Sequence, residues 1–124
     1  MEAPSTFQGQ LVRADVSDYI EAIDKDQRPL FDCVHRLIME VQPDAHVVIS
    51  YRTPTYVVAM CRLHVGVWKH GLSFYGWEQG RGSALVADHP HLDDGKGTLR
   101  LPVAEVARIG DDELRAFAGA VLSE

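Results

Sequence analysis

The hydrophobic period of the chain changes at His46, and this change limits the available folds more than any other feature does. Before His46, apolar residues recur every three or four positions, as in helices. After it, β-branched residues gather in short runs, as in strands. The short connections between these runs force antiparallel pairing. We predict strands near residues 46–51, 55–61, 64–69 and 72–76.

Two helices are predicted before the strands. Residues 16–23 carry apolar side chains at helical intervals after Asp15 or Ser17, either of which can accept hydrogen bonds from the first free N–H groups. A second helix runs from a cap near Asp26 to the residue before Pro43, because a residue that precedes proline avoids helical angles. We expect the two helices to form a hairpin.

The rest of the chain completes an α+β pattern. Residues 80–97 are rich in Gly, Asp and Pro and are predicted to be a loop with a helical turn at 83–87. A short strand follows at residues 98–101, and a last helix begins near Gly110 or Asp111. Strands flanked by helices indicate an antiparallel sheet, here of four to five strands, with the N-terminal helical hairpin and the C-terminal helix packed on one face.

Residues 1–14 are predicted to be a flexible tail, and residues 15–124 a single domain. The sheet face away from the helices should be partly exposed, and aromatic side chains there would suit ligand binding or a dimer interface. The alternation within 64–69 places His64, Gly66 and Trp68 on one face, but the other strands are not assigned. Aromatic candidates for the exposed face are Tyr56, His64, Trp68, Phe74 and Trp77.

Composition excludes some partners. The chain has 124 residues, net charge −6 and scattered basic residues, whereas nucleic-acid binding relies on clustered Lys and Arg, so no nucleic-acid partner is expected. Residues 1–10 do not have the pattern of a secretion signal, and no apolar stretch has the length of a membrane span. Cys33 and Cys61 read as small buried hydrophobes in a reducing compartment. We therefore expect a cytoplasmic protein without a membrane partner.

Three segments carry a resemblance to a known family. Residues 49–56 (ISYRTPTY), 69–75 (KHGLSFY) and 96–102 (KGTLRLP) resemble, in order and spacing, motifs of the YdhG-like family of bacterial proteins. The resemblance covers about residues 15–122, although Arg52-Thr53 replaces the family's usual Gly-Met. Some members are described as frataxin-like iron chaperones, so the resemblance implies a YdhG-like α+β fold and iron as a ligand.

Two groups of residues are candidate metal ligands. Asp18 and Glu21, with Asp15 and Asp24, form an acidic ridge on the first predicted helix, and such exposed carboxylates would hold iron weakly. His89 and His91 lie in the acidic segment 88–94, where imidazole and carboxylate groups suit iron or zinc. The spacing matches no known zinc motif, and in both groups the alternative is a solvated surface.

A third group suits an anion or a small metabolite. Lys96 and Arg100 flank a glycine and a hydroxyl, and Arg100 could grip a carboxylate or phosphate with its guanidinium fork, unless it pairs with a carboxylate of the chain itself. Tyr51 precedes Pro54 in what reads as a turn, and its hydroxyl could line a pocket. The candidate ligand-binding residues are Tyr51, Lys69, His70, Lys96, Thr98 and Arg100.

Three hypotheses follow from the sequence. The chain is an intracellular binding protein of the YdhG-like type that handles iron, an anion or small-metabolite binder with or without catalysis, or an interaction module that forms a homodimer. The sequence contains neither GxSxG nor HExxH, so it gives no support to an enzyme.

Overall fold

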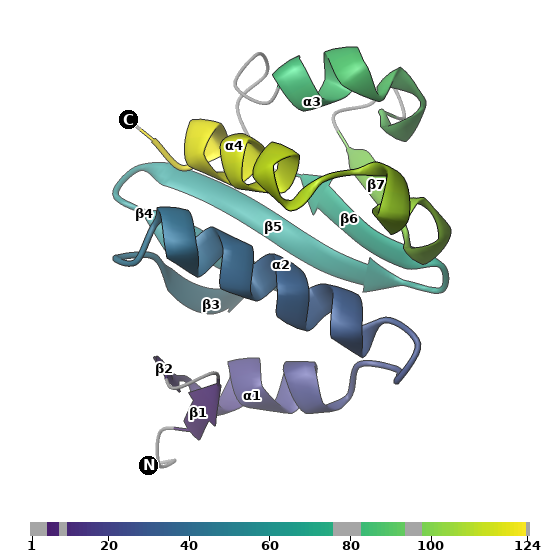
Figure 1. The fold of residues 1–124 in the computed structure, drawn as a ribbon. Coiled ribbons are helices and arrows are strands. Elements are labelled where there is room, and N and C mark those ends of the chain that lie inside the picture. The colour runs from purple at the N-terminus through teal and green to yellow at the C-terminus, as the bar shows by residue number, and fades with distance from the viewer. Residues whose placement is uncertain (1–4, 8–9, 76–82, 94–97, 124) are drawn as a thin grey trace.

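The segment of changed period forms one antiparallel sheet, in the order β3-β4-β5-β6-β7 (Figure 1). The structure is a computed structural model that describes residues 5–7, 10–75, 83–93 and 98–123. Residue pairs Ser50–Thr53, Val58–Cys61 and Trp68–Gly71 close three successive hairpins, each with a turn of two residues. β4 begins earlier than the sequence predicts because its turn has two residues instead of three, and β5 begins earlier because the following turn lies at residues 59–60 instead of 62–63. The strands are β3 (His46–Ser50), β4 (Thr53–Val58), β5 (Cys61–Trp68), β6 (Gly71–Tyr75) and β7 (Leu99–Pro102).

Helices cover one face of this sheet, so the predicted α+β architecture is confirmed. In Figure 1, α2 and α4 lie side by side across the same face, and the two helices are in contact. Phe117 of α4 packs on Phe74 of β6, with ring centroids 5.5 Å apart. The helices are α1 (Ala14–Glu21), α2 (Arg28–Val41), α3 (Ser83–Asp88) and α4 (Asp111–Val121), with 3-10 turns η1 (Pro90–Leu92) and η2 (Val103–Arg108).

The first helix lies beside the sheet, and it runs opposite to α2 as the predicted hairpin requires (Figure 1). It contacts β3 and β4, and the hydroxyl of Tyr19 accepts a hydrogen bond of 3.2 Å from the N–H of Val67. The helix begins earlier than predicted, with Arg13 rather than Asp15 or Ser17 at the N-cap position. Two three-residue strands, β1 (Ser5–Phe7) and β2 (Gln10–Val12), pair within the predicted tail. They are too short for a periodic signal in the sequence.

Strand register assigns every sheet residue to a face. Tyr56 pairs with Leu63, and Val65 pairs with Phe74, so these four side chains point towards α2 and α4. The sequence offered Tyr56 and Phe74 for the exposed face, and this was wrong: they are 0% and 1% exposed. Trp77 lies outside the described residues. The opposite face, as we call the side away from α2 and α4, includes Thr53, Thr55, His64, Gly66, Trp68, Ser73, Tyr75 and Arg100.

The turn between β3 and β4 is strained. Tyr51 and Arg52 form it with φ angles of 53° and 62°, the left-handed region that two-residue hairpin turns require and that glycine or asparagine usually fills. Pro54, predicted to frame the turn, is instead a buried residue inside β4, opposite Ile49. The hairpin closes before the proline because Ser50 and Thr53 already pair.

Replacing Arg52 with glycine should therefore stabilise the protein by about 0.5–1 kcal/mol, since glycine adopts this φ without a Cβ clash. Urea unfolding of the two proteins measures the difference. Arg62→Gly is the matched control, because this exposed arginine lies inside β5, where glycine weakens a strand. A lower stability for Arg52→Gly than for the parent chain would contradict the strain.

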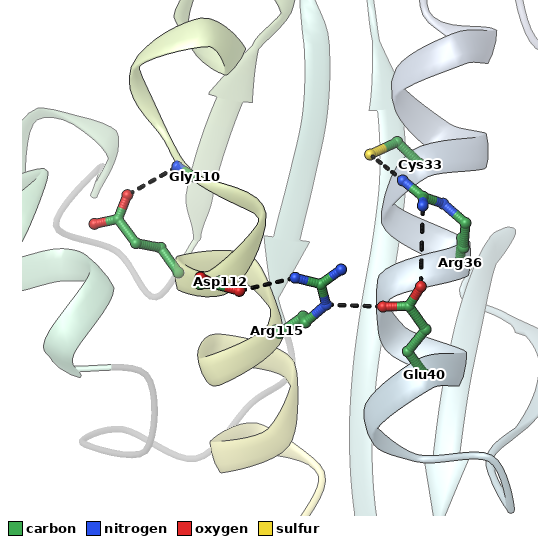
Figure 2. A network of polar contacts seen from close by, with 7 residues as sticks. Cys33, Arg36, Glu40, Gly110, Asp112 and Arg115 are labelled. Carbon is green, nitrogen blue, oxygen red and sulfur yellow. Dashed lines mark hydrogen bonds and ion pairs between the residues drawn. The ribbon is translucent and has the colours of Figure 1, made fainter.

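Exposed charges connect the two covering helices (Figure 2). The guanidinium of Arg115 on α4 donates hydrogen bonds of 2.8 Å to Glu40 on α2 and to Asp112 on its own helix. Arg36 adds a longer contact of 3.9 Å to Glu40. Such solvent-exposed pairs contribute little each, so they orient α2 and α4 more than they stabilise them. None of the described helices has the length and apolar character of a membrane span.

Candidate functional site

The sheet is rich in basic residues although the protein is acidic. Residues 46–75, which include strands β3 to β6, contain no Asp or Glu, whereas the whole chain has a net charge of −6. The same segment contains Arg52, Arg62 and Lys69, and β7 adds Arg100. The acidic residues therefore lie on the helices and loops, and the surface of the sheet favours negatively charged ligands.

The arginines of the sheet differ from those of the helical region in their partners. Among the described residues, Arg52, Arg62 and Arg100 form no ion pair with a carboxylate. A guanidinium that is not paired with a carboxylate keeps its N–H donors available to a ligand. In contrast, ion pairs with carboxylates are formed by Arg13, Arg28, Arg36, Arg108 and Arg115.

Arg100 is held in place by an aromatic ring. Its guanidinium carbon lies 5.3 Å from the centroid of the Trp68 ring, close enough for a cation–π interaction. Because Arg100 is on β7 and Trp68 on β5, this contact spans the intervening strand β6. The ring of His70, in the β5–β6 turn, meets Trp68 edge-on at 5.2 Å. An exposed cation is thus fixed above the sheet beside a second nitrogen-bearing ring.

A cluster of hydroxyl and aromatic groups surrounds His64 on the same face. Thr55 Oγ1 lies 2.6 Å from His64 Nδ1, and the imidazole stacks on the ring of Tyr75 with centroids 4.9 Å apart. Tyr51 meets the imidazole edge-on at 5.7 Å. Burial, and after it the charge of Arg62, lowers the pKa of His64. The imidazole is therefore neutral at neutral pH and can act as a hydrogen-bond acceptor.

Gly66 lets this cluster form across three strands. The Tyr75 hydroxyl on β6 donates a hydrogen bond of 2.9 Å to Thr53 Oγ1 on β4, so the ring reaches over β5. A Cβ at Gly66 would already lie 3.5 Å from Tyr75 and 3.6 Å from Thr53, so a larger side chain would displace the ring. Thr53 in turn donates to the carbonyl of Tyr51 at 3.3 Å, which connects the cluster to the strained turn.

The structure brings some of the predicted ligand-binding residues to this face. His70 and Arg100 both contact Trp68, and Tyr51 contacts His64. Lys69, in the same turn as His70, is exposed, and its carbonyl accepts a hydrogen bond of 2.6 Å from the buried Gln27. Thr98 is half-buried beside β7, and Lys96 lies outside the described residues.

The sequence offers His64, the centre of the cluster, as one of five aromatic candidates for the face away from the helices, and the strand register places it on that face. His64 was placed opposite the apolar residues of its strand, but Thr53, Thr55 and Tyr75 were not connected with it. The alternation of β5 was a usable signal, and two-residue turns would have aligned the hydroxyl residues of β4 and β6 with it.

The predicted metal ligands are not brought together. Asp18 and Glu21 are exposed on α1, beside the β3 edge of the sheet, whereas His89 and His91 lie next to β7 at the other edge (Figure 1). Within the described part of the chain, no three His, Cys, Asp or Glu side chains form a group that could hold a metal ion.

Each of the two loop histidines contacts a glutamate instead. His89 Nε2 lies 3.1 Å from Glu113, and His91 Nε2 lies 3.4 Å from Glu105. The N–H of Gly110, and after it His89, lowers the pKa of Glu113. Glu113 thereby caps the N-terminus of α4, because Gly110 is the N-cap residue of this helix and its N–H donates to Glu113 at 3.0 Å. The predicted cap position of the last helix is confirmed.

A second histidine is buried inside the core. His35 of α2 is 2% exposed, and its Nδ1 lies 2.7 Å from the hydroxyl of Tyr56. Burial lowers the pKa of His35 to about 4, against an opposing effect of Asp32. Burial also raises the pKa of Tyr56. The pair joins α2 to β4 on the covered face and is not part of the surface around His64.

Comparisons with protein-family models, curated proteins and solved structures find no match to this chain. The candidate site therefore rests on geometry and charge alone.

Proposed function

We propose that this domain binds a small anionic ligand on the opposite face of the sheet, with Arg100 as the anchor. The observation that carries the proposal is the state of Arg100, which is exposed, placed over the ring of Trp68 and not in an ion pair within the described residues. A guanidinium fork matches a carboxylate or a phosphate group in a bidentate way.

Two further features support this assignment. The cation–π contact with Trp68 limits the rotamers of Arg100, so less side-chain entropy is lost when an anion binds. The absence of Asp and Glu from residues 46–75 means that no sheet carboxylate competes for the guanidinium. The ring of His70, beside Trp68, could add a second donor.

We expect Arg100→Ala to weaken the binding of phosphorylated or carboxylated metabolites about tenfold or more, because a charge-assisted hydrogen bond is lost. A thermal-shift panel of such compounds finds ligands, and isothermal titration measures their affinity for each variant. Arg62→Ala is the matched control, since it removes an exposed arginine from the same face near the far end of β5.

Equal losses in Arg100→Ala and Arg62→Ala would mean that only the net charge matters, and this would reject Arg100 as an anchor. A panel without any saturable ligand would reject the anion proposal itself.

The other two hypotheses stay predictions. Iron binding of the YdhG-like type would use separate exposed carboxylates such as Asp18 and Glu21, and titration of the metal-free protein with ferrous iron tests it. A homodimer would use the same sheet face as the anion, and light scattering of the protein in solution tests it. No contact among the described residues favours either one over the anion site.

A further inference from the structure

The hydrogen bonds around His64 indicate which of its ring nitrogens carries the proton. The hydroxyl of Thr55 donates to the carbonyl oxygen of Thr53 at 3.1 Å, and a carbonyl oxygen can only accept. The single proton of that hydroxyl is thereby used. We infer that Nδ1–H is the donor in the short contact of 2.6 Å between His64 Nδ1 and Thr55 Oγ1, because this arrangement satisfies both contacts of the hydroxyl. In the neutral ring, Nε2 therefore carries the lone pair.

This lone pair has no partner in the described part of the protein. Thr55 and His64 are 0% and 7% exposed, and no described residue forms a hydrogen bond with Nε2. Among the described residues, Nε1 of Trp68 is the one side-chain nitrogen or oxygen that is both fully buried and without a hydrogen-bond partner. Because Nε2 of His64 also has no partner but is not in that class, it keeps some contact with solvent. An oriented acceptor thus lies between the rings of Tyr51 and Tyr75.

His64 and Arg100 lie on one continuous surface. Arg100 pairs with Ser73, and Ser73 pairs with Gly66, which is two residues from His64 along β5. Normal strand spacings put the Cα atoms of His64 and Arg100 about 12 Å apart. Between them are Ser73 on β6 and Gly66 on β5, and the ring of Tyr75 crosses over Gly66, so a ligand that contacts both side chains lies over the outer edge of this ring. A ligand of about the size of a sugar phosphate could therefore reach both side chains.

We propose that the ligand bound by Arg100 also presents a hydroxyl or N–H donor to His64 Nε2, so that the ligand class is hydroxylated phosphates or carboxylates. This inference rests on the proposed anion site and adds a specificity-determining residue to it. Tyr51 and Tyr75 orient the imidazole, while Thr55 fixes its tautomer. An aliphatic anion without a donor would leave Nε2 unpaired under the ligand, which costs affinity.

Two pairs of probes of matched length test the inference by titration: ribose 5-phosphate against n-pentyl phosphate, and gluconate against hexanoate. The parent protein should prefer the hydroxylated member of at least one pair roughly five- to tenfold. In His64→Asn, the amide can still donate to Thr55 but lacks the Nε2 acceptor, so the preference should disappear. Arg100→Ala should weaken both members of the pair.

The outcomes separate the two proposals. Equal binding of both members of a pair by the parent protein, or an unchanged preference in His64→Asn, overturns the role of His64 but leaves the anion site. Failure of all four probes to bind overturns both. The nitrogen and Cδ2 chemical shifts of His64 in the parent protein give an independent check that does not depend on whether the variant folds. Protonation of Nε2 rather than Nδ1 in the neutral ring would contradict the inference.

Discussion

Replacing Gly71 with alanine is expected to lower the free energy of unfolding by about 3 kcal/mol, the upper range for overpacking, because the added methyl group would meet the backbone rather than a movable side chain. A Cβ at this position would lie 2.1 Å from the carbonyl oxygen of Leu101 and 2.7 Å from Cα of Pro102. Both atoms belong to the backbone of β7, so the clash can be relieved only if β6 and β7 separate. Urea unfolding followed by circular dichroism measures the loss.

Gly119→Ala provides the matched control, since it makes the same chemical change where there is space. Gly119 lies inside α4, and a Cβ there has no neighbour within 4 Å. Alanine is the better helix former by about 1 kcal/mol, so this variant should be more stable than the parent protein. If Gly71→Ala is as stable as the parent chain, β7 cannot approach β6 as closely as the structure has it.

The close approach at Gly71 also shapes the candidate site. Gly71 pairs with Trp68 on one side and with Pro102 on the other, and the N–H of Val103 donates to the carbonyl of His70 at 2.8 Å. These contacts hold β7 against the β5–β6 hairpin. Arg100 can therefore reach the ring of Trp68 across β6. Gly71 thus connects the packing of the sheet to the geometry of the proposed anchor.

The alternation of side chains made much of the fold predictable from the sequence. In β5, Leu63, Val65 and Val67 alternate with His64 and Gly66, and the first set faces the helices as a period of two requires. Local patterns of this kind also predicted α2, the N-terminal cap of α4 and the helical turn that became α3. These predictions succeed because each depends only on how the side chains of a single helix or strand pack against the core.

Register between strands was harder to predict, and with it the site. The partner of Tyr56 depends on where the next turn lies: the structure centres this turn on Ala59 and Met60, which pairs Tyr56 with Leu63, whereas the predicted strands put it at residues 62–63. Proline is usual in turns, so the strained pair at Tyr51 and Arg52 was not anticipated. Contacts across strands, such as Tyr75 with Thr53, follow from the register and could not be read from one strand alone.

His35 shows how a helical pattern can hide a polar core residue. It lies four positions after Phe31, so helical spacing places it on the buried stripe of α2, yet a lone histidine on a helix is usually exposed. The partner that makes its burial tolerable, Tyr56, comes from a strand 21 residues later. The pair could be identified only after β4 and α2 were placed together.

This buried histidine should make the protein sensitive to acid. The pKa of His35 in the folded protein is about 4, whereas the ordinary value is 6.5, so between these values the unfolded chain binds more protons than the folded one. The contribution of His35 to the free energy of unfolding is therefore fully present above about pH 6.5. It falls as the pH decreases towards 4, by about 3 kcal/mol in total. His64, whose pKa is also lowered by burial, changes stability in the same direction.

His35→Asn isolates this contribution, because the amide can still hydrogen-bond to Tyr56 at the position of Nδ1 but cannot take up a proton in this range. The variant should be less stable than the parent at pH 7, since it fills less of the core. Between pH 6.5 and 4, however, its free energy of unfolding should fall by about 3 kcal/mol less than that of the parent. Urea unfolding at several pH values measures both slopes, with His46→Asn, a change of an exposed histidine on β3, as the control. If the free energies of unfolding of the parent and of His35→Asn fall in parallel with pH, His35 accepts a proton in the folded core without cost. The buried pair with Tyr56 would then have to open more easily than its 2.7 Å contact implies.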